Sequence, residues 1–501
     1  MKKMAKNKKT AQIGYLSALI IIVGSTIGAG IFFKNGAVAS YAQRDIAFIV
    51  AAWIISAAGM IFIGLALIEL ASSTKNDRGF LAWIKNFNNR FFSRYTMSYM
   101  LIISFPLQFL TLPLFVVQTL QDAGNFQLNG WVVAIIALGI FLWLAILTHI
   151  SLNIGKALAW VFTFLKYIPL LIAPIFAFVA SGNTTDSQAL SAVVNPSGLS
   201  GYSKWLGLIA AVPSIIFVYD GFYTATSLRS NIKKKNSIGP LMIIGILIVT
   251  VTYLFLTIGF ALGTTNGKIS GLTNTPNWVK LLFNILISMS ILGLINNQVM
   301  AIPRVYKSVA EDNEFFLLHK FAKLFKFKNQ NLAAFSFFIT IVLAYYVLWI
   351  PIGLYALTAN SGASDYGQEA ANLYNVADLI TGFSSLVIFF WIAISILGAL
   401  RNRRTGKVEV VKQKFFIVSA IISVIFIFAA SGFFTVESFV NIFLLTGPDQ
   451  VNAIIKFVFF VFTLVFPLTI VLLENVFAKD YLKLSEPGTN LDKIKVEAKA
   501  S

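Results

Sequence analysis

The segment GSTIGAGIF, residues 24–32, carries three glycines within the first long apolar run of the chain. A glycine inside a helix costs about 1 kcal/mol relative to alanine. Backbone that opens inside a bilayer leaves polar groups unpaired unless a cavity or a ligand satisfies them. The glycines therefore have two interpretations: close packing between helices through small residues, or a helix interrupted at this point. In an interrupted helix, the N–H groups of Gly28, Ala29 and Gly30 begin the second half and form a positive site suited to a carboxylate.

The composition of the whole chain indicates that its solvent is lipid. Of the 501 residues, 57% are hydrophobic and 12% are charged, which is too little polar surface for a soluble globular protein. Cysteine is absent and the histidines are His149 and His319, so disulfides, thiolate chemistry and Cys/His zinc sites are excluded. We therefore expect an all-α integral membrane protein with no catalytic residue, no metal site and no cofactor.

Runs of about 20 apolar residues are long enough to cross a bilayer as helices. About twelve such runs follow one another, near residues 14–33, 46–70, 97–120, 130–150, 159–181, 205–228, 238–263, 278–301, 333–354, 376–399, 414–435 and 450–475. We expect four regions along the chain. They are a basic N-terminal segment (1–13), a ten-helix core (14–400), two further helices with the loop that precedes them (401–475), and a C-terminal tail (476–501).

Basic residues are distributed unevenly between the loops, and cationic loops stay on the cytoplasmic side of a membrane. With the N-terminus inside, 32 of the 39 Lys and Arg residues fall in cytoplasmic segments. Five lie on or beside outer loops, Lys34 among them, and Lys166 and Lys456 lie within helices. We therefore expect an even number of spans, both termini in the cytoplasm, and a multi-pass protein of the plasma membrane. The net charge of +19 then favours contact with anionic membrane lipid, and no nucleic-acid partner is expected.

A second interruption is predicted in the sixth apolar run. The sequence FVYDGF, residues 217–222, places Asp220 and Gly221 in the middle of an otherwise apolar span. Transporters built from inverted repeats have a broken helix at the corresponding position of each half, and they bind substrate between the two breaks. Because the two interruptions are five helices apart, we expect a 5+5 inverted repeat with broken helices 1 and 6, plus two peripheral helices.

These motifs resemble, in order and spacing, those of the amino acid, polyamine and organocation (APC) transporter superfamily, whose bacterial members are amino acid permeases. The likeness covers roughly residues 11–410. Besides the two breaks, the matching landmarks are Glu69-Leu70 with Gly79 and Trp83 after helix 2, Asn153, Gly155 and Lys156 before helix 5, Arg304-Val305-Tyr306 with residues 310–312 after helix 8, and Ser384-Ser385 with Arg401 in helix 10.

The chain also departs from the family pattern. After helix 6, Asn231 and Lys235 stand where the family usually has an acidic residue and a proline, and Tyr223 stands where some exchangers carry a glutamate. The usual glycine pair after helix 2 is reduced to Gly79. These differences concern the inner gate and the exchange mechanism rather than the site at helix 1.

The resemblance implies a binding site for the amino acid backbone between the two breaks. The α-carboxylate would meet the N–H groups of Ala29 and Gly30, next to Gly28, and the α-ammonium would meet the carbonyls near Thr26 and Asp220. Charge-assisted hydrogen bonds of this kind contribute about 1.5 to 3 kcal/mol each. For Asp220 we favour a structural role, capping or tethering the break, over contact with a cationic substrate.

Selectivity for the side chain is expected from other groups. Phe217 is the predicted lid over the substrate, and Tyr219 and Gly221 complete the second break. Polar residues of helices 3, 8 and 10 would face the pocket; they include Gln108, Asn296 and Asn297. The alternative for these three amides is a hydrogen bond between helices.

Ionisable residues at membrane depth are functional candidates because each is costly there. In several relatives a helix-5 lysine takes the place of a sodium ion, and Lys166 stands at the matching position. This implies sodium-independent transport, with the ammonium replacing the cation and able to release a proton during the cycle. The alternative is that Lys166 extends toward the cytoplasmic interface. The ionisable residues nearer helix ends are interpreted as solvated at the interface; they are Glu69, Asp378, His149, Lys456 and Glu474.

Together these features favour a secondary active transporter of amino acids that works by alternating access, is sodium-independent, and is either proton-coupled or exchanging. Helices 1, 2, 6 and 7 would rock against the other helices, in a monomer or a homodimer. A non-transporting amino acid sensor and a transporter of polyamines or other organic cations are the alternatives. The sequence lacks the converging ligands or activated nucleophile of an enzyme and the continuous polar path of a channel.

Overall fold

A computed structural model describes residues 14–28, 30–43, 45–73, 80–182, 198–221, 238–264, 269–272, 275–311, 314–358 and 363–478. Within these ranges the protein is built from helices, and the one extended pairing is a bridge between Thr264 and Leu272. The predicted all-α architecture is therefore confirmed.

The first span is divided into two short helices, α1 (Tyr15–Thr26) and α2 (Gly30–Tyr41). The other helices are α3 (Ile46–Ser72), α4 (Phe80–Phe87), α5 (Arg90–Ser98), η1 (Tyr99–Ser104), α6 (Phe105–Gly124), α7 (Gly130–Ile150), α8 (Leu152–Gly182), η3 (Gly198–Gly201), α9 (Lys204–Val218), α10 (Ile238–Gly263), η6 (Ile269–Gly271), α11 (Asn277–Glu311), α12 (Phe316–Leu324), α13 (Gln330–Tyr355), α14 (Ala363–Tyr366), α15 (Gln368–Thr405), α16 (Phe416–Leu444) and α17 (Gly447–Phe477).

Among the described residues, 10 helices are long and apolar enough to cross a membrane, and α5, η1 and α6 form one of them. The broken pair α1–α2 and the shorter apolar α9 bring the spans to the predicted number. Several helices are longer than the apolar runs that predicted them. One of these is α15, which continues to Thr405, so the predicted core boundary at residue 400 falls inside it. Its last turn carries Arg403 and Arg404, which hydropathy assigns to a loop although the backbone stays helical.

Helices that are five spans apart pack against each other. The pairs are α2 with α9, α3 with α10, α6 with α11, and α7 with α13. Two halves related by a pseudo-two-fold axis are expected to pair in this way. The packing therefore agrees with the predicted inverted repeat.

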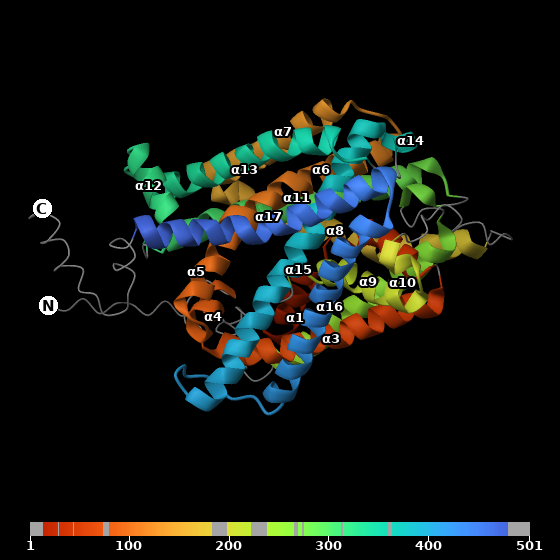
Figure 1. Cartoon of the computed structure of the whole chain (residues 1–501). Helices are drawn as coiled ribbons and strands as arrows, with labels where there is room; N and C mark the ends of the chain where they lie inside the picture. The colour runs from red at the N-terminus through yellow and green to blue at the C-terminus, as the bar shows by residue number, and fades with distance from the viewer. Residues whose placement is uncertain are drawn as a thin grey trace, which may run out of the picture.

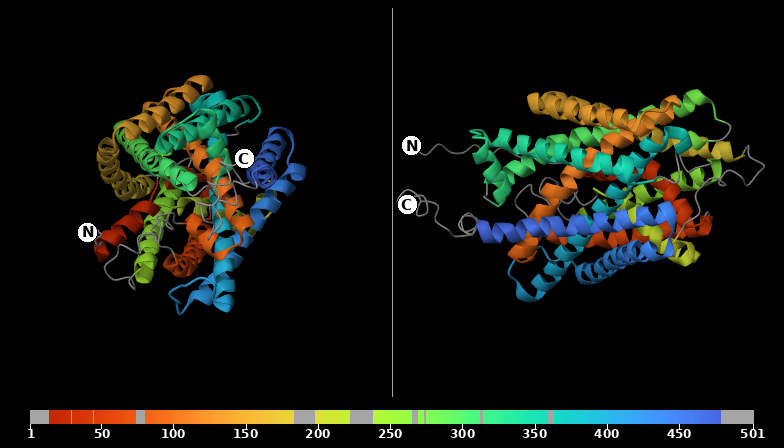
Figure 2. Two further views of the ribbon diagram at one scale, coloured as in Figure 1. Left: turned by 90° about the vertical axis from the view of Figure 1, so that its left-hand side faces the viewer. Right: turned by 45° about the horizontal axis from the view of Figure 1, so that its top comes forward.

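The helices form two groups joined by α15. In Figure 1, α6, α7, α11 and α13 lie side by side in one part of the bundle, and α1, α3, α9 and α10 lie in another. The long helix α15 runs obliquely between them and packs against α6 of the first group and α9 of the second. Figure 2 shows α16 and α17 at the outside of the bundle, as predicted for the two peripheral helices, although α16 also packs against α3.

Side chains at helix starts explain where some spans begin. Asp45 accepts a hydrogen bond from Ala47 N at the start of α3, and Asn129 accepts one from Trp131 N at the start of α7. Each cap satisfies one of the N–H groups that a first turn leaves without a partner. Lys204 also pairs with Asp45 at 2.7 Å and lowers the pKa of this carboxyl group.

Candidate substrate site at the broken helix

The first helix opens between Thr26 and Gly30, at the glycine-rich segment. Ile27 has an extended backbone (φ −70°, ψ 111°), and its N–H donates the last hydrogen bond of α1, to Val23 O at 2.8 Å. Gly30 is the first residue of α2. Ala29, one of the predicted carboxylate-binding residues, lies outside the described residues. The first turn of α2 leaves N–H groups without helical partners at the positive end of the helix dipole.

The carbonyl end of α1 is occupied by two side chains from other helices. Lys166 on α8 is buried, and its Nζ donates to Gly24 O and, at 3.4 Å, to Ile27 O. Tyr253 on α10 donates to Thr26 O at 3.4 Å. A cation is favoured at the C-terminal end of a helix dipole. Lys166 is thus directed at the break and not at the membrane interface, which contradicts the alternative interpretation of this residue.

Phe217 lies directly against the start of α2. A Cβ atom placed on Gly30 would be 2.8 Å from Cε1 of Phe217, closer than real Cβ contacts. On the other side, a Cβ on Gly28 would lie 3.5 Å from Cδ1 of Leu294 on α11. Sequence reasoning missed Leu294, because an isolated leucine in an apolar helix gives no chemical signal. The predicted lid and the glycines of the break are therefore neighbours.

The second interruption follows the end of α9 at Val218. Gly221 has φ +101°, in the region that favours glycine. Asp220 Oδ2 accepts a hydrogen bond from Ser385 Oγ on α15 at 2.9 Å. This contact agrees with a tether. Residues 222–237, which include Tyr223, lie outside the described residues.

Tyr219 is turned away from the start of α2, into an aromatic cluster. Its hydroxyl group shares a hydrogen bond of 2.5 Å with Thr250 Oγ1, and its ring centroid lies 6.0 Å from those of Trp53 and Tyr253. The side chain is fully buried. The Tyr219 side chain therefore packs within the protein beside the break, and its predicted role in substrate binding stays a prediction.

The three predicted amides have different surroundings. Asn296 is buried and donates to Gly155 O on α8 at 2.9 Å, which is the helix–helix hydrogen bond considered as its alternative. Asn297 is exposed on α11, three positions beyond Leu294, and Gln108 on α6 is half-buried. The roles of Asn297 and Gln108 in binding stay predictions.

Lys34 was placed on or beside an outer loop from the sequence, and the structure instead places it within a helix. The residue is part of α2 and is buried, and its Nζ pairs with Asp378 Oδ1 on α15 at 2.5 Å. The same ammonium lies 5.1 Å from the centroid of the Phe217 ring. Hydropathy placed the end of the first span near residue 33, whereas the helix continues to Tyr41. An ion pair between α2 and α15 therefore stands beside the predicted lid.

Glu69 and Glu474 are also paired inside the protein, not solvated at the interface as predicted. Glu474 accepts a hydrogen bond of 2.6 Å from Arg94 Nη2, and both side chains are buried. Glu69 is 1% exposed and accepts from Nε and Nη2 of Arg403 at 2.8 and 2.6 Å. Such two-point Arg–carboxylate contacts are among the strongest hydrogen bonds in proteins.

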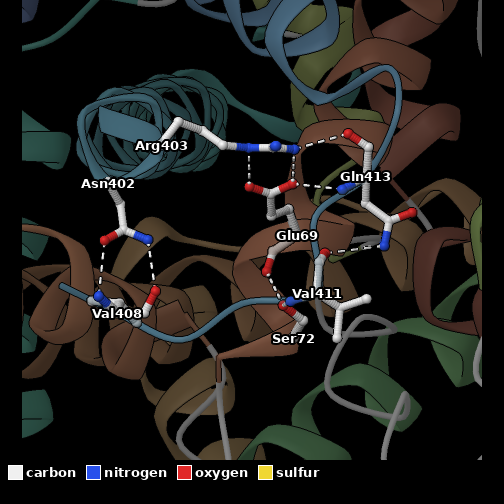
Figure 3. A network of polar contacts seen from close by, with 7 residues as sticks. All are labelled: Glu69, Ser72, Asn402, Arg403, Val408, Val411 and Gln413. Carbon is white, nitrogen blue, oxygen red and sulfur yellow. Dashed lines mark hydrogen bonds and ion pairs between the residues drawn. The ribbon is translucent and has the colours of Figure 1, made fainter. Parts of the chain in front are cut away.

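The Glu69–Arg403 pair belongs to a network that fixes the loop between α15 and α16 (Figure 3). Gln413 N donates to Glu69 Oε2 at 2.8 Å, and Gln413 O accepts from Arg403 at 2.9 Å. Val411 N donates to Ser72 Oγ at 2.8 Å. The network thereby joins the end of α3 to the end of α15 by a second ion pair, at a distance from the one between Lys34 on α2 and Asp378 on α15.

Helical spans gathered around a broken first helix, with Lys166 at the carbonyl end of the break and the Lys34–Asp378 ion pair beside it, are typical of a multi-pass membrane transporter. A family model described as amino acid permease matches residues 13–473. The chain belongs to the amino acid permease family, and the predicted APC superfamily is confirmed. The family is one of transporters, and its members' substrates are amino acids.

The chain is similar in sequence to two bacterial proteins. The chain is 27% identical over 497 residues to an uncharacterized protein of Mycoplasma pneumoniae, covering 88% of this chain and 87% of the relative. It is 27% identical over 353 residues to the serine/threonine exchanger SteT of Bacillus subtilis, covering 66% of this chain and 75% of the relative.

Proposed function

We propose that this protein carries amino acids across the plasma membrane by alternating access, without sodium, and with both termini in the cytoplasm. The observation that supports this most strongly is that the two helix ends at the break have different neighbours. Lys166 occupies the carbonyl end of α1, and the N-terminal end of α2 lies against Phe217. An anionic group of the substrate is the natural partner for that positive helix end.

Binding follows from this geometry. The substrate carboxylate accepts from the N–H groups at the start of α2, and the substrate ammonium faces the carbonyls at the two breaks. Phe217 and Leu294 flank the start of α2 and so contact the substrate side chain. Because SteT is a serine/threonine exchanger, serine and threonine are the first substrates to test, and exchange is the first mode.

The moving part is the group α1, α2, α3, α9 and α10, in which α10 packs against α1 and α3, and α9 against α2 and α3. It is connected to α15 by the pairs Lys34–Asp378 and Glu69–Arg403. Opening on one side requires the nearer pair to separate or α15 to follow the group. The two pairs therefore limit the motion at opposite ends of the bundle.

The site itself is tested by a cysteine at Leu294, because the natural chain contains no cysteine. We expect a maleimide to label Leu294→Cys, and L-serine or L-threonine to slow the labelling by occupying the space beside Gly28. Val411→Cys, in the exposed loop of the network, serves as the matched control and is labelled at the same rate with or without amino acid. Equal labelling of Leu294→Cys in both conditions, across all amino acids, contradicts this placement of the substrate.

Replacing Lys166 by methionine is expected to lower the initial rate of amino acid uptake by about tenfold or more. The change removes two hydrogen bonds to the carbonyl end of α1, and a loss of about 1.4 kcal/mol corresponds to a factor of ten. The measurement is uptake into proteoliposomes, with and without sodium, and with Lys320→Met on exposed α12 as control. Uptake by Lys166→Met at the normal rate would show that the ammonium is dispensable.

A further inference from the structure

The connection between α11 and α13 contains a turn that carries both lysines and large apolar side chains. Its sequence is KLFKFK, residues 323–328, and we call it the basic turn. Leu324 and Phe325 are 75% and 59% exposed, and the three lysines are exposed as well. None of these lysines forms an ion pair with a carboxylate group of the described residues. Cationic and apolar side chains thus lie together on one short exposed segment, outside the substrate site.

Hydrogen bonds at the end of α12 fix the backbone of the basic turn. Phe327 N donates to Ala322 O at 3.0 Å. Lys326 N donates to Lys323 O at 3.2 Å, and Lys326 has φ +53°. These two bonds form a Schellman motif, in which the left-handed position is usually glycine. The backbone therefore favours glycine at residue 326, and a lysine there is consistent with a use for its charge.

Packing and a cap hold the basic turn in place from both ends of α12. The ring of Phe321 lies 5.2 Å from that of Phe337 on α13 and 5.9 Å from that of Phe327. At the other end of α12, Phe316 N donates to Glu474 Oε1 on α17 at 3.0 Å. The exposed side chains of the basic turn are therefore presented from a fixed support.

The basic turn lies where the chain enters the membrane again. The span α11 ends at Glu311, and α13 begins at Gln330, two positions after Lys328. Figure 1 shows α12 at the same end of the bundle as the end of α17, on the proposed cytoplasmic side. At such a boundary, apolar side chains enter the edge of the hydrocarbon layer while lysines reach the headgroups. The cytoplasmic leaflet is also the one that carries anionic lipids.

We propose that the basic turn is a binding site for anionic phospholipid headgroups. Leu324 and Phe325 enter the membrane boundary, and the three lysines donate to the headgroup phosphates. A lipid fits this surface better than an acidic protein, because a soluble partner would have to displace lipid from the two apolar side chains. Since α12 packs against α13, which lies outside the proposed moving group, the bound lipid anchors the part of the bundle that stays still. The inference goes beyond the proposed transport function and does not depend on it.

The test uses a fluorophore at the basic turn. The natural chain contains no cysteine, so Leu324→Cys is labelled with bimane and placed in phosphatidylcholine vesicles. These contain a small and equal mole fraction of either brominated phosphatidylglycerol or brominated phosphatidylcholine, because bromine quenches a fluorophore that it contacts. We expect phosphatidylglycerol to quench about fivefold more strongly, the enrichment that corresponds to about 1 kcal/mol of attraction to a lysine.

Two variants with equal loss of charge separate this site from the general charge of the protein. Changing all three lysines of the basic turn to glutamine is expected to make quenching by the two lipids equal. The matched control combines Lys407→Gln, Lys412→Gln and Lys414→Gln, which neutralise three exposed lysines of the loop between α15 and α16. This control keeps the preference for phosphatidylglycerol. All six side chains are exposed, so both variants are expected to fold.

Equal quenching by the two lipids with the natural basic turn overturns the inference. A preference that survives in the glutamine variant of the basic turn, or that is lost in the loop control as well, also overturns it. Absence of quenching by either lipid would show that the turn does not contact the membrane, and it would favour a soluble acidic partner instead. None of these readings requires transport, so a failure of the proposed function is measured separately.

Discussion

We expect valine at Gly30 to reduce amino acid uptake by a factor of about 100 or more. The first added carbon would lie 2.8 Å from Cε1 and 3.3 Å from Cδ1 of Phe217, and the branched side chain fills the space that the substrate carboxylate needs at the start of α2. A β-branched residue would also block the approach to the N–H groups proposed to bind this carboxylate. Losing two charge-assisted hydrogen bonds of about 1.5 to 3 kcal/mol each lowers uptake by a factor of about 100 or more.

The measurement is initial uptake by proteoliposomes with equal amounts of inserted protein. Gly432→Val is the matched control, because a Cβ at Gly432 on α16 meets no atom within 4 Å, and it is expected to transport normally. Gly30→Val should also lose the protection of Leu294→Cys by amino acid when the two changes are combined. Normal transport by Gly30→Val would mean that the substrate does not use the start of α2.

Replacing Glu69 by alanine is expected to lower the free energy of unfolding by about 3 to 5 kcal/mol, the usual cost of removing one partner of a buried ion pair. Glu69 accepts three hydrogen bonds from Arg403 and Gln413. Without it, Arg403 keeps its hydrogen bond to Gln413 O, and the loop is attached to α3 by the hydrogen bond from Val411 N to Ser72 Oγ but no longer through Gln413 N. The effect is measured by denaturant unfolding of the purified protein in detergent.

Two comparisons separate a paired charge from a general effect of mutation. The double replacement Glu69→Leu with Arg403→Leu removes both charges and is expected to cost clearly less than Glu69→Ala. Glu409→Ala changes an exposed acid of the same loop and should leave stability nearly unchanged. A loss below about 1 kcal/mol in Glu69→Ala is typical of an exposed pair and would contradict the buried network seen in Figure 3.

The architecture was predictable because membrane-spanning helices leave a local signal. Length and hydropathy located the spans, and the three glycines of residues 24–32 located the break between Thr26 and Gly30. Lys166 was recognisable as a candidate because a charged residue inside a membrane span is energetically costly, and this can be seen without knowing its partner. Each of these inferences depends on residues close together in the chain.

The pairings across the bundle were not predictable in this way. Lys34 and Asp378 are separated by 344 positions, and Glu69 and Arg403 by 334, so no local pattern connects them. Hydropathy also assigns helical turns with charged residues to loops, and the predicted end of the first span therefore fell before Lys34. The substrate-contacting role proposed for Leu294 depends on the crossing of α11 near Gly28. Tertiary packing decides these contacts, and a single sequence does not display it.

The protein is proposed to transport amino acids that bind at the break in its first helix. The most direct measurement is uptake of a panel of labelled amino acids into proteoliposomes of the purified protein, under a sodium gradient, a pH gradient, or with unlabelled amino acid inside. We predict saturable uptake of one group of amino acids, unaffected by sodium and absent in Gly30→Val. No flux of any amino acid under any of these gradients, from protein shown to be folded, would contradict the account and leave an amino acid sensor or a carrier of other organic cations as the better interpretation.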